Sequence, residues 1–396
     1  MRVAYICADP GVPVFGTKGS SVHVQEMVRA WRRAGADVTV YCVRAGNDKP
    51  ADLGGLDVVE RPPRKAEPAG RERAVEEAAY SLGDTALRDG CDVAYERYSL
   101  FSPALSFVAG TLGVPAVLEV NAPLIEEQQR YRQLFDVGLA ESMLRRNALA
   151  ADAVACVSEP VLRWVKQRVP EARTVLAPNG VNTDRITARP WERPGGRPGR
   201  PGSGRFVVAF TGTLKPWHGV PDLLEAVARA NADPDRAGLW TVRIIGDGPG
   251  RPDLERLAAR LGVEAEFTGA VLPESVPRLL HECDAAAAPY PQPEPGQDHY
   301  FSPLKVYEYL AAGMPVIATA VGQIPAVIEH GRTGLMVAAG DPAAFAAALK
   351  RLASDAALRE RLGTQARAAA VEHHSWDGVL SLITAALASR QEVARS

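Results

Sequence analysis

The stretch HYFSPLKVYEYLAAGMPVIAT, His299–Thr319, indicates the fold class more directly than any other part of the chain. Ser302 and Pro303 sit where a short loop opens a helix, and Gly313 ends that helix before an apolar strand begins. A loop, a helix and a strand in this order are typical of a parallel sheet. The first amides of such a helix are unpaired and its dipole is positive at this end, so the segment suits a phosphate group.

Strand and helix patterns alternate along both halves of the chain. The strands expected in the first half are Arg2–Ala8, Asp37–Val43, Leu56–Glu60, Asp92–Glu96, Ala116–Val120, Ala153–Ser158 and Thr174–Ala177. Those expected in the second half are Arg205–Thr211, Trp240–Gly246, Ala265–Gly269, Asp284–Pro289, Pro315–Thr319 and Leu335–Ala338. Strands separated by helices predict an α/β protein with two doubly wound, Rossmann-like parallel sheets, which bind ligands at the carboxyl ends of their strands.

Proline, glycine and arginine dominate residues 186–204, a composition that does not form a packed core. We therefore predict an N-terminal Rossmann-like domain over residues 1–185, a linker over 186–204 and a C-terminal domain over 205–374. The last helix, residues 375–396, follows the complete second sheet, and we expect it to pack back on the first domain.

Composition and charge narrow the functional classes. The 396 residues are 46% hydrophobic and 23% charged, as in an ordinary soluble protein, and a net charge of −2 gives no electrostatic case for nucleic acid. No apolar run reaches the roughly 18 to 20 residues that a membrane span needs. The arginines of residues 125–146 alternate with acidic residues, which favours a solvated face and allows at most peripheral membrane contact.

The N-terminus and the cysteines both point to the cytoplasm. MRVAYICADPG predicts a strand and a loop and lacks the features of a signal peptide. The five cysteines are isolated in or beside apolar segments, and no pair has metal-ligand spacing. We expect them to be reduced, buried and free of metal.

Ser302–Glu308, together with the two predicted sheets, resembles the retaining, nucleotide-sugar-dependent glycosyltransferases of family 4, which have the GT-B fold. The resemblance covers nearly the whole length, with the motifs in the family's order. It implies metal-independent transfer of a hexosyl group to an acceptor hydroxyl, with the nucleoside diphosphate sugar as co-substrate and no other cofactor. A UDP-sugar is favoured over a GDP-sugar as the donor.

The segment FTGTLKPWHGV, Phe210–Val220, resembles the family segment that faces the donor diphosphate with an arginine and a lysine. After Gly212, Thr213 stands at the arginine position and His218 at the lysine position. Lys215 is the cation that remains between them. The resemblance therefore assigns catalytic roles to Lys215 and His218, because a leaving diphosphate needs positive charge.

Two further glycine segments resemble the family's nucleotide-binding turns. In IIGDGPG, Gly246 and Gly248 form a strand-to-helix turn, although the spacing does not complete a dinucleotide fingerprint. In FTGAV, Ala270 and Val271 match the edge that contacts the nucleobase. These positions are assigned to the donor.

The opening segment matches the family's pair of glutamates only in part. Glu308 matches the second glutamate, which binds ribose, whereas Tyr300 replaces the first, which lies by the donor sugar. Asp298 or His299 could partly substitute for this missing glutamate. We assign both residues to the acceptor side. The diphosphate would be faced by the start of the helix, namely Ser302, Pro303 and the amides of Leu304 and Lys305.

The first domain supplies the remaining candidates. In KGSSVHVQEM, Gly19 and His23 match family positions at the donor, and Asn121 stands where the family has a histidine near the donor sugar. His23 and Asn121 are therefore catalytic candidates, although a structural asparagine in a turn is an equal alternative for Asn121. The acceptor-side candidates at strand ends are Glu96, Arg97, Tyr98 and Glu119.

Three functions stay open at this stage. Retaining sugar transfer is favoured, by a front-face displacement without a protein nucleophile. A non-catalytic nucleotide-sugar-binding protein is the alternative, because Tyr300, Thr213 and His218 depart from the family pattern. A nicotinamide-dependent oxidoreductase would need a complete dinucleotide fingerprint, which neither half contains. The acceptor could be a small molecule, a lipid or a glycan.

Overall fold

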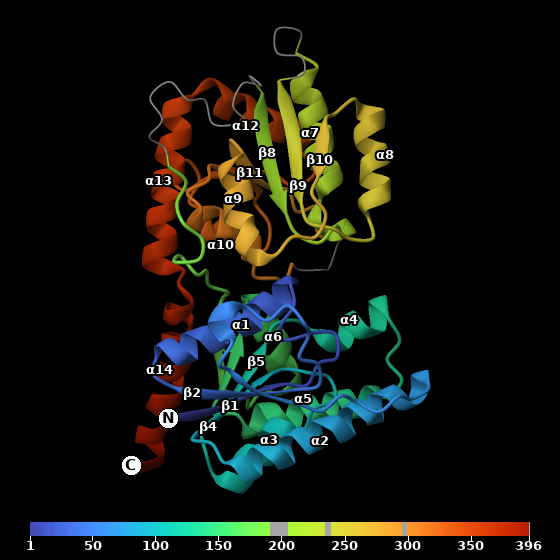
Figure 1. The fold of residues 1–396 in the computed structure, drawn as a ribbon, viewed down its shortest axis with the longest axis vertical. Helices are drawn as coiled ribbons and strands as arrows, with labels where there is room; N and C mark the ends of the chain where they lie inside the picture. Colours follow the sequence, from blue (N-terminus) through green and yellow to red (C-terminus); the bar gives the residue numbers. More distant parts are fainter. Residues whose placement is uncertain (191–204, 234–238, 295–298, 396) are drawn as a thin grey trace. The chain divides into compact units, whose positions relative to one another are not determined.

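The computed structural model of the chain describes residues 1–190, 205–233, 239–294 and 299–395 (Figure 1). Most of the predicted linker and the candidate Asp298 lie outside these residues. The chain forms two compact units, and the first contains Met1–Asn179, Tyr300–Ser302 and the C-terminal segment from Trp376. The second contains Gly180–His299 and Pro303–Ser375. This division differs from the predicted boundaries at residue 180 and in the placement of residues 300–302.

The first unit is built on a seven-stranded parallel sheet in the order β3-β2-β1-β4-β5-β6-β7. The strands are β1 (Arg2–Cys7), β2 (Asp37–Cys42), β3 (Asp57–Glu60), β4 (Val93–Arg97), β5 (Ala116–Val120), β6 (Ala153–Cys156) and β7 (Thr174–Leu176). The helices are α1 (Gly19–Arg33), α2 (Arg71–Asp89), α3 (Ala104–Leu112), α4 (Leu124–Tyr131), α5 (Val137–Ala150), α6 (Glu159–Arg168) and α14 (Trp376–Arg395). The predicted doubly wound sheet is confirmed. Strand β5 has the expected bounds, and the other six differ from theirs by one or two residues at one or both ends.

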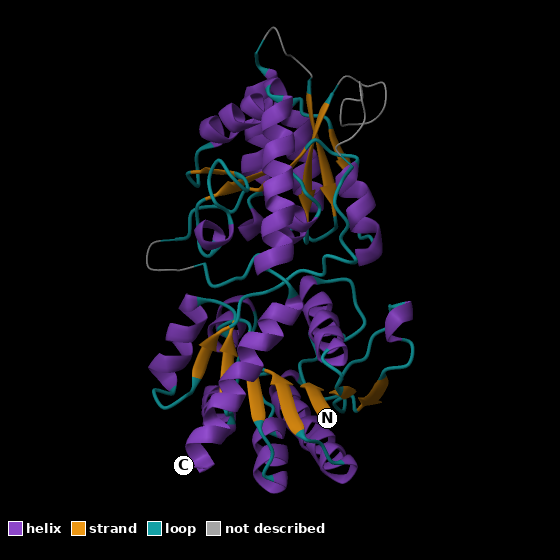
Figure 2. Ribbon diagram, turned by 90° about the vertical axis from the view of Figure 1, so that its left-hand side faces the viewer, coloured by secondary structure: helices purple, strands orange, loops and turns teal. Residues whose placement is uncertain are grey.

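Helices cover both faces of this sheet because its strands are apolar on both sides. Helices α2, α3 and α5 lie on one face and α1 and α14 on the other (Figure 1). Figure 2 shows α14 as a long helix running across the strands. Its apolar side is buried through Trp376, Leu380 and Ile383, and the helix packs against α1, β6 and β7.

The second unit repeats the plan with a six-stranded parallel sheet in the order β10-β9-β8-β11-β12-β13. The strands are β8 (Phe206–Thr211), β9 (Trp240–Ile245), β10 (Ala265–Phe267), β11 (Ala285–Ala288), β12 (Val316–Thr319) and β13 (Leu335–Val337). The helices are α7 (Val220–Asn231), α8 (Arg251–Leu261), α9 (Val276–His281), α10 (Leu304–Ala311), α11 (Ile324–Val327), α12 (Pro342–Ser354) and α13 (Ala356–His373). The sheet is confirmed, and the sequence reading missed the 18-residue helix α13, which begins after Asp355 accepts a hydrogen bond from the Leu358 amide.

Residues 180–190 are part of the second unit, although the sequence placed their last five in a linker. Arg189 donates from its backbone to the Ala312 carbonyl at 2.9 Å and from its side chain to the Cys283 carbonyl at 2.8 Å. Arg367 donates to the Ile186 carbonyl at 2.6 Å. These contacts hold the segment against α10 and α13. Its arginine-rich composition suggested a linker, but residues 186–190 are packed on the second unit.

Two other expectations concern membranes and cysteines. Residues 125–146 form two helices, α4 and part of α5, joined by a loop. In the part of the chain that the structure describes, no helix combines the length and apolar character needed to cross a bilayer.

All five cysteines are buried and unpaired. Burial raises the pKa of Cys7, Cys42, Cys156 and Cys283 to about 12, so these thiols are inert.

Candidate functional site

Three loops and one helix of the second unit meet at the carboxyl edge of its sheet. Gly212 follows β8 with φ 143°, and Gly246 follows β9 with φ 139°. A Cβ on Gly246 would lie 2.1 Å from the Gly212 carbonyl oxygen, and one on Gly248 would lie 2.6 Å from the Leu214 amide nitrogen. The Leu214 amide donates to the Asp247 carbonyl at 3.0 Å. Glycine is required because the two loops pack backbone against backbone.

The helix α10 opens next to these loops with an uncapped N-terminus. Its N-cap residue is Pro303, which makes no side-chain cap, and the amides of Leu304 and Lys305 precede the first intrahelical bond. Unpaired amides and the positive helix dipole are thus placed at the strand ends, as the sequence predicted for a phosphate site. The segment His299–Thr319 therefore contains both the start of α10 and the strand β12.

Lys305 is buried, with 8% of its surface exposed. Its Nζ lies 4.1 Å from the centre of the Phe210 ring and 5.0 Å from that of Tyr290, and it has no hydrogen-bond partner among the described residues. Burial lowers the pKa of Lys305 to about 7, although the nearby Glu308 carboxylate raises it. The sequence reading assigned only the backbone amide of this residue and missed the side chain.

The other predicted charged groups lie on the loop after β8. Nδ1 of His218 donates to the Thr213 carbonyl, and burial followed by the charge of Lys305 lowers the pKa of His218 to about 3. The ring is therefore neutral at pH 7, and its single proton is used on Thr213. Lys215 is half-buried, and its Nζ lies 5.6 Å from the centre of the exposed Trp217 ring. Lys215 thus carries a charge on this loop, and His218 does not.

Glu308 lies in the second turn of α10, and its carboxylate is held by Arg185. The Arg185 guanidinium is 3.4 Å from Glu308 Oε1 and also donates to the Pro273 carbonyl at 3.1 Å. Both side chains of the pair are less than one fifth exposed. Arg185 was not among the predicted site residues, because it is the last residue of the predicted N-terminal domain and lies 123 residues before Glu308.

The predicted nucleobase edge follows β10. Gly269, with φ 75°, forms an antiparallel bridge with Gly246, which brings Ala270 and Val271 beside the glycine loops. Ala270 is exposed and Val271 is half-buried. Their contact with a nucleobase stays a prediction.

Tyr300–Ser302 belongs to the first unit, although α10 belongs to the second. The Tyr300 hydroxyl donates to the Glu127 carboxylate, and its carbonyl accepts from Ser158 Oγ at 2.6 Å. Ser302 Oγ accepts from the Asn179 amide at 2.9 Å. Tyr300 therefore has a partner in the first unit, at the position where the family carries a glutamate.

His23 and Glu119, which are far apart in sequence, form a buried pair in the first unit. Each has 3% of its surface exposed, and Nε2 of His23 contacts the Glu119 carboxylate. Nδ1 of His23 lies 2.7 Å from Asn179 Oδ1, while Asn179 Nδ2 donates to the Ser302 carbonyl at 2.8 Å. The Trp376 ring packs edge-on against the imidazole. Burial alone would raise the pKa of Glu119, but His23, Arg97 and Asn121 lower it overall.

The remaining first-unit candidates divide between the site and the core. Glu96 is fully buried, and its carboxylate accepts from the Leu105 amide at 2.7 Å at the start of α3. Tyr98 is also buried, against Trp164. Both side chains make contacts within the fold of the first unit, and their acceptor-side roles stay predictions. Arg97 is half-buried at the end of β4, and Gly19 is the exposed first residue of α1.

His299 lies in the second unit, where its Nε2 contacts the Pro291 carbonyl at 2.8 Å and its ring packs on Tyr290. The imidazole is therefore tied to the loop after β11. Asp298 cannot be placed, because it lies outside the described residues. Its assignment remains a prediction from the sequence.

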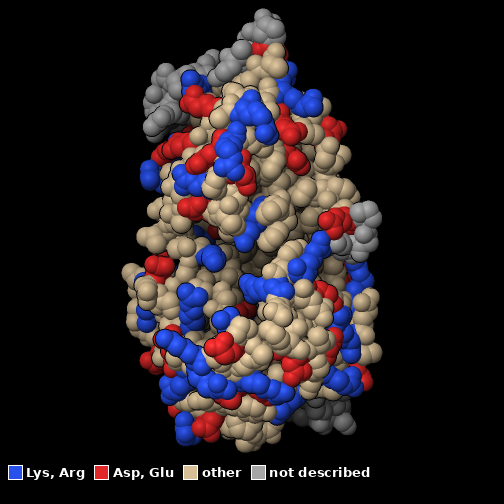
Figure 3. Space-filling view, turned by 90° about the vertical axis from the view of Figure 1, so that its right-hand side faces the viewer, with Lys and Arg blue, Asp and Glu red and all other residues tan. Residues whose placement is uncertain are grey.

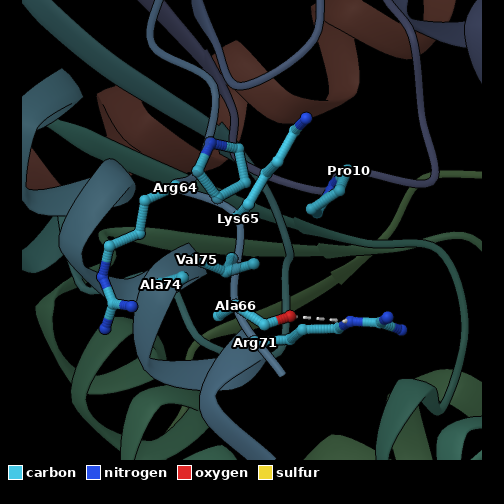
Figure 4. Close-up of a pocket in the computed structure, with 8 residues that line it drawn as sticks. Pro10, Arg64, Lys65, Ala66, Arg71, Ala74 and Val75 are labelled. Carbon is cyan, nitrogen blue, oxygen red and sulfur yellow. Dashed lines mark hydrogen bonds between the residues drawn. The ribbon is translucent and has the colours of Figure 1, made fainter. Parts of the chain in front are cut away.

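A pocket of about 440 Å³ lies in the first unit, between the loop after β1 and the start of α2 (Figure 4). Its lining includes Pro10 and three basic residues, Arg64, Lys65 and Arg71. Arg64 pairs with Glu77 at 2.7 Å, and Arg71 donates to the Ala66 carbonyl at 3.4 Å. The Lys65 side chain extends from the pocket wall in Figure 4. Three basic side chains thus line the pocket, and one of them is paired with a carboxylate.

Outside this pocket, charges of both signs are interspersed on the face shown in Figure 3, in keeping with the small net charge. Among the described residues, no group of three or more histidine, cysteine, aspartate or glutamate side chains is arranged to hold a metal ion.

Two sequence families match the chain. The family described as Glycosyltransferase Family 4 matches residues 17–185, and Glycosyl transferases group 1 matches residues 205–355. A D-inositol 3-phosphate glycosyltransferase of Streptomyces griseus is 33% identical over 57% of this chain and 52% of its own length. Another from Acidothermus cellulolyticus is 29% identical over 98% of this chain and 88% of its own. The matched part spans between about a quarter and two thirds of the first three curated relatives.

Solved structures have the same fold. Sucrose-phosphate synthase of Thermosynechococcus elongatus superposes with a TM-score of 0.73 and 17% identity over the full length of both chains. HepE of Anabaena in complex with UDP gives a TM-score of 0.70 and 19% identity over 98% of this chain and all of its own.

Proposed function

Because the chain belongs to glycosyltransferase family 4 and has the GT-B fold, we propose that it transfers a sugar from a nucleoside diphosphate sugar to an acceptor hydroxyl. The observation that carries the proposal is the donor site of the second unit. The unpaired amides of α10 and the ribose-binding candidate Glu308 lie beside two backbone-packed glycine loops. UDP is the favoured nucleotide.

The reaction that we propose retains the anomeric configuration. The bond between the sugar C1 and the β-phosphate oxygen breaks, the acceptor oxygen attacks C1 on the same face, and its proton passes to the leaving phosphate oxygen. No side chain forms a covalent bond with the sugar. The protein's contribution is positioning and charge stabilisation, for which the α10 N-terminus and the cation Lys215 are available. No divalent metal takes part in this proposal.

The acceptor that we propose is a small hydroxylated molecule carrying a phosphate. Several curated relatives are named for D-inositol 3-phosphate, and the first unit contains a pocket with Arg64, Lys65 and Arg71 in its lining. A phosphate suits this pocket because lysine and arginine donate charge-assisted hydrogen bonds to its oxygens. Lys65→Met should weaken acceptor use without affecting donor binding. If an inositol phosphate and unphosphorylated inositol serve equally, the phosphate requirement is wrong.

Calorimetry and turnover test the function in sequence. UDP and GDP are titrated into the full chain, and UDP release from a set of UDP-sugars is then measured with and without inositol phosphates. We expect UDP binding and acceptor-stimulated release, with the product's anomeric configuration read by NMR. Binding without turnover across the set would favour the alternative of a non-catalytic nucleotide-sugar-binding protein. In this chain Tyr300, which replaces the family's first glutamate, is bonded to Glu127. If neither UDP nor GDP binds, both the transferase and the non-catalytic alternative are wrong.

A further inference from the structure

Lys305 is a buried cation without a hydrogen-bonded partner, and such a group needs an explanation. Its ammonium has three N–H donors, none of which has an acceptor among the described residues. The rings of Phe210 and Tyr290 offer a cation–π surface. They do not replace the hydrogen bonds that the ammonium loses on leaving water. The position is costly for the fold alone.

The ammonium points at the loop where a phosphate is expected. A Cβ on Gly212 would lie 3.2 Å from Lys305 Nζ and 3.8 Å from the His218 ring, so the missing side chain of Gly212 leaves this space open. The same lysine is the second residue of α10, whose first amides are unpaired. The side chain and the helix N-terminus thus act on the same region of the second unit.

The groups around Lys305 do not supply a buried positive charge, so this lysine is its source. Thr213 and His218 stand where the family has an arginine and a lysine. His218 is neutral at pH 7, because its pKa is lowered to about 3, and its Nδ1 proton is bonded to Thr213. The imidazole therefore presents an unprotonated Nε2, which repels phosphate oxygens. Lys215 is half-buried and lies on the outer part of the loop, over Trp217.

We propose that the Lys305 ammonium is the buried counter-charge for the bound donor diphosphate, acting from α10 in addition to the half-buried Lys215 on the loop after β8. This inference rests on the proposed function and assigns its diphosphate site. Burial has already removed the ammonium from water, so a bound phosphate supplies the missing acceptors without a further desolvation cost on the lysine. The bare site is held at the expense of stability, as is common where binding groups are pre-organised.

The test compares affinity and stability in one variant. Lys305→Met keeps the stem and removes the charge. We expect the affinity for UDP to fall on the order of 10- to 100-fold, because charge-assisted hydrogen bonds are lost, while the affinity for uridine stays unchanged. The ligand-free Tm should equal or exceed that of the wild type, since an unsatisfied buried charge is removed. Lys350→Met, which removes a surface lysine paired with Asp233, is the matched control and should leave UDP affinity unchanged.

Each outcome is decisive. UDP affinity within threefold of the wild type overturns the inference, as does an equal loss of UDP and uridine affinity. A lower ligand-free Tm would show that the lysine serves the fold through its contacts with Phe210 and Tyr290. If Lys305→Met does not fold, the same affinities and Tm are measured for Lys305→Gln, which replaces the ammonium with a neutral polar group. A wild-type chain that binds neither UDP nor GDP would instead contradict the proposed function, before Lys305 is considered.

Discussion

The His23 ring and the Glu119 carboxylate form a buried hydrogen-bonded pair across 96 residues of sequence. The second ring nitrogen faces Asn179 Oδ1, so both nitrogens of His23 are placed to donate. The pair ties α1 to the end of β5, which is where the sequence placed two separate roles, one catalytic and one on the acceptor side. The structure tests neither role. It shows that the two residues are bonded to each other, so a change in one affects the other.

Glu119→Gln should destabilise the first unit, because it leaves the buried imidazole without its carboxylate. Breaking a buried pair typically costs about 3 to 5 kcal/mol. The pKa of Glu119 is lowered in the folded state from its ordinary value of 4.5, so the carboxylate's contribution is present above about pH 4.5 and is lost as the pH falls below it. Thermal unfolding of both proteins between pH 3 and 7 checks this. A gap in Tm that does not shrink in acid contradicts it, and Glu77→Gln at the exposed Arg64 pair is the control.

Glu96→Gln should stabilise the protein at alkaline pH. Burial raises the pKa of Glu96 to about 8, so the folded state keeps a proton that the unfolded state loses near pH 4.5. Stability therefore falls as the pH rises from about 4.5 to 8, and glutamine removes this dependence. The Tm advantage of the variant should grow between pH 5 and 8. An advantage that is constant with pH would show that Glu96 is not protonated in the folded protein.

Glu308→Gln should weaken nucleotide binding. A carboxylate accepts stronger hydrogen bonds from ribose hydroxyls than a neutral amide does, and we expect a loss of about tenfold in UDP affinity by calorimetry. The substitution also removes the charge that holds Arg185. Glu264→Gln, which removes a carboxylate from a surface pair with Arg205 before the first residues of β8 and β10, should have no effect. Unchanged affinity for both UDP and GDP in the Glu308 variant rules out ribose contact.

Lys215→Met should lower kcat more than it raises KM for the donor. The cation on the loop after β8 would act as charge develops on the leaving diphosphate, and such losses are on the order of 100-fold. His218→Gln should keep a near-normal kcat, because the imidazole is already neutral. Both variants are compared in one turnover assay. A near-normal Lys215 variant beside an inactive His218 variant would transfer the role to the histidine.

Turnover should not depend on a divalent metal. We expect the same rate before and after EDTA, because lysine side chains and helix amides are available to balance the diphosphate charge. Loss of the rate with EDTA, and its recovery with magnesium or manganese, would falsify metal independence. A zinc-only recovery would be separated from these by adding each metal alone.

The fold could be predicted from the sequence because its signals are local. The alternation of strands with helices and the turn residues around α10 are each visible within about twenty residues. The boundary at residue 180 could not be predicted, because Arg189 and Ile186 are fixed by partners more than 90 residues away. Composition alone made that segment resemble a linker.

The sequence proposed candidate site residues by type and position, but it could not indicate their long-range partners. Glu308 was recognisable by its place in the opening segment, whereas Arg185, its partner, is 123 residues earlier. Lys305 was missed as a side chain because a lysine in the first turn of a helix is usually solvated. Lys305 is buried because its side chain packs against the rings of Phe210, at the end of β8, and Tyr290, in the loop after β11. The acceptor-side role of Glu96 stays a prediction, and its carboxylate accepts a hydrogen bond at the start of α3, which a carboxylate at a strand end is equally able to do.

The placement of α14 bears on how the chain folds during synthesis. The seven strands of the first unit are complete once Leu176 has left the ribosome, but the helix that covers α1, β6 and β7 begins at Trp376, about 200 residues later. At synthesis rates of roughly 5 to 20 residues per second, that face stays uncovered for about 10 to 40 s. During this interval an apolar surface is open to the nascent chain's surroundings. A chaperone that binds apolar segments would therefore find its substrate in the half that is made first.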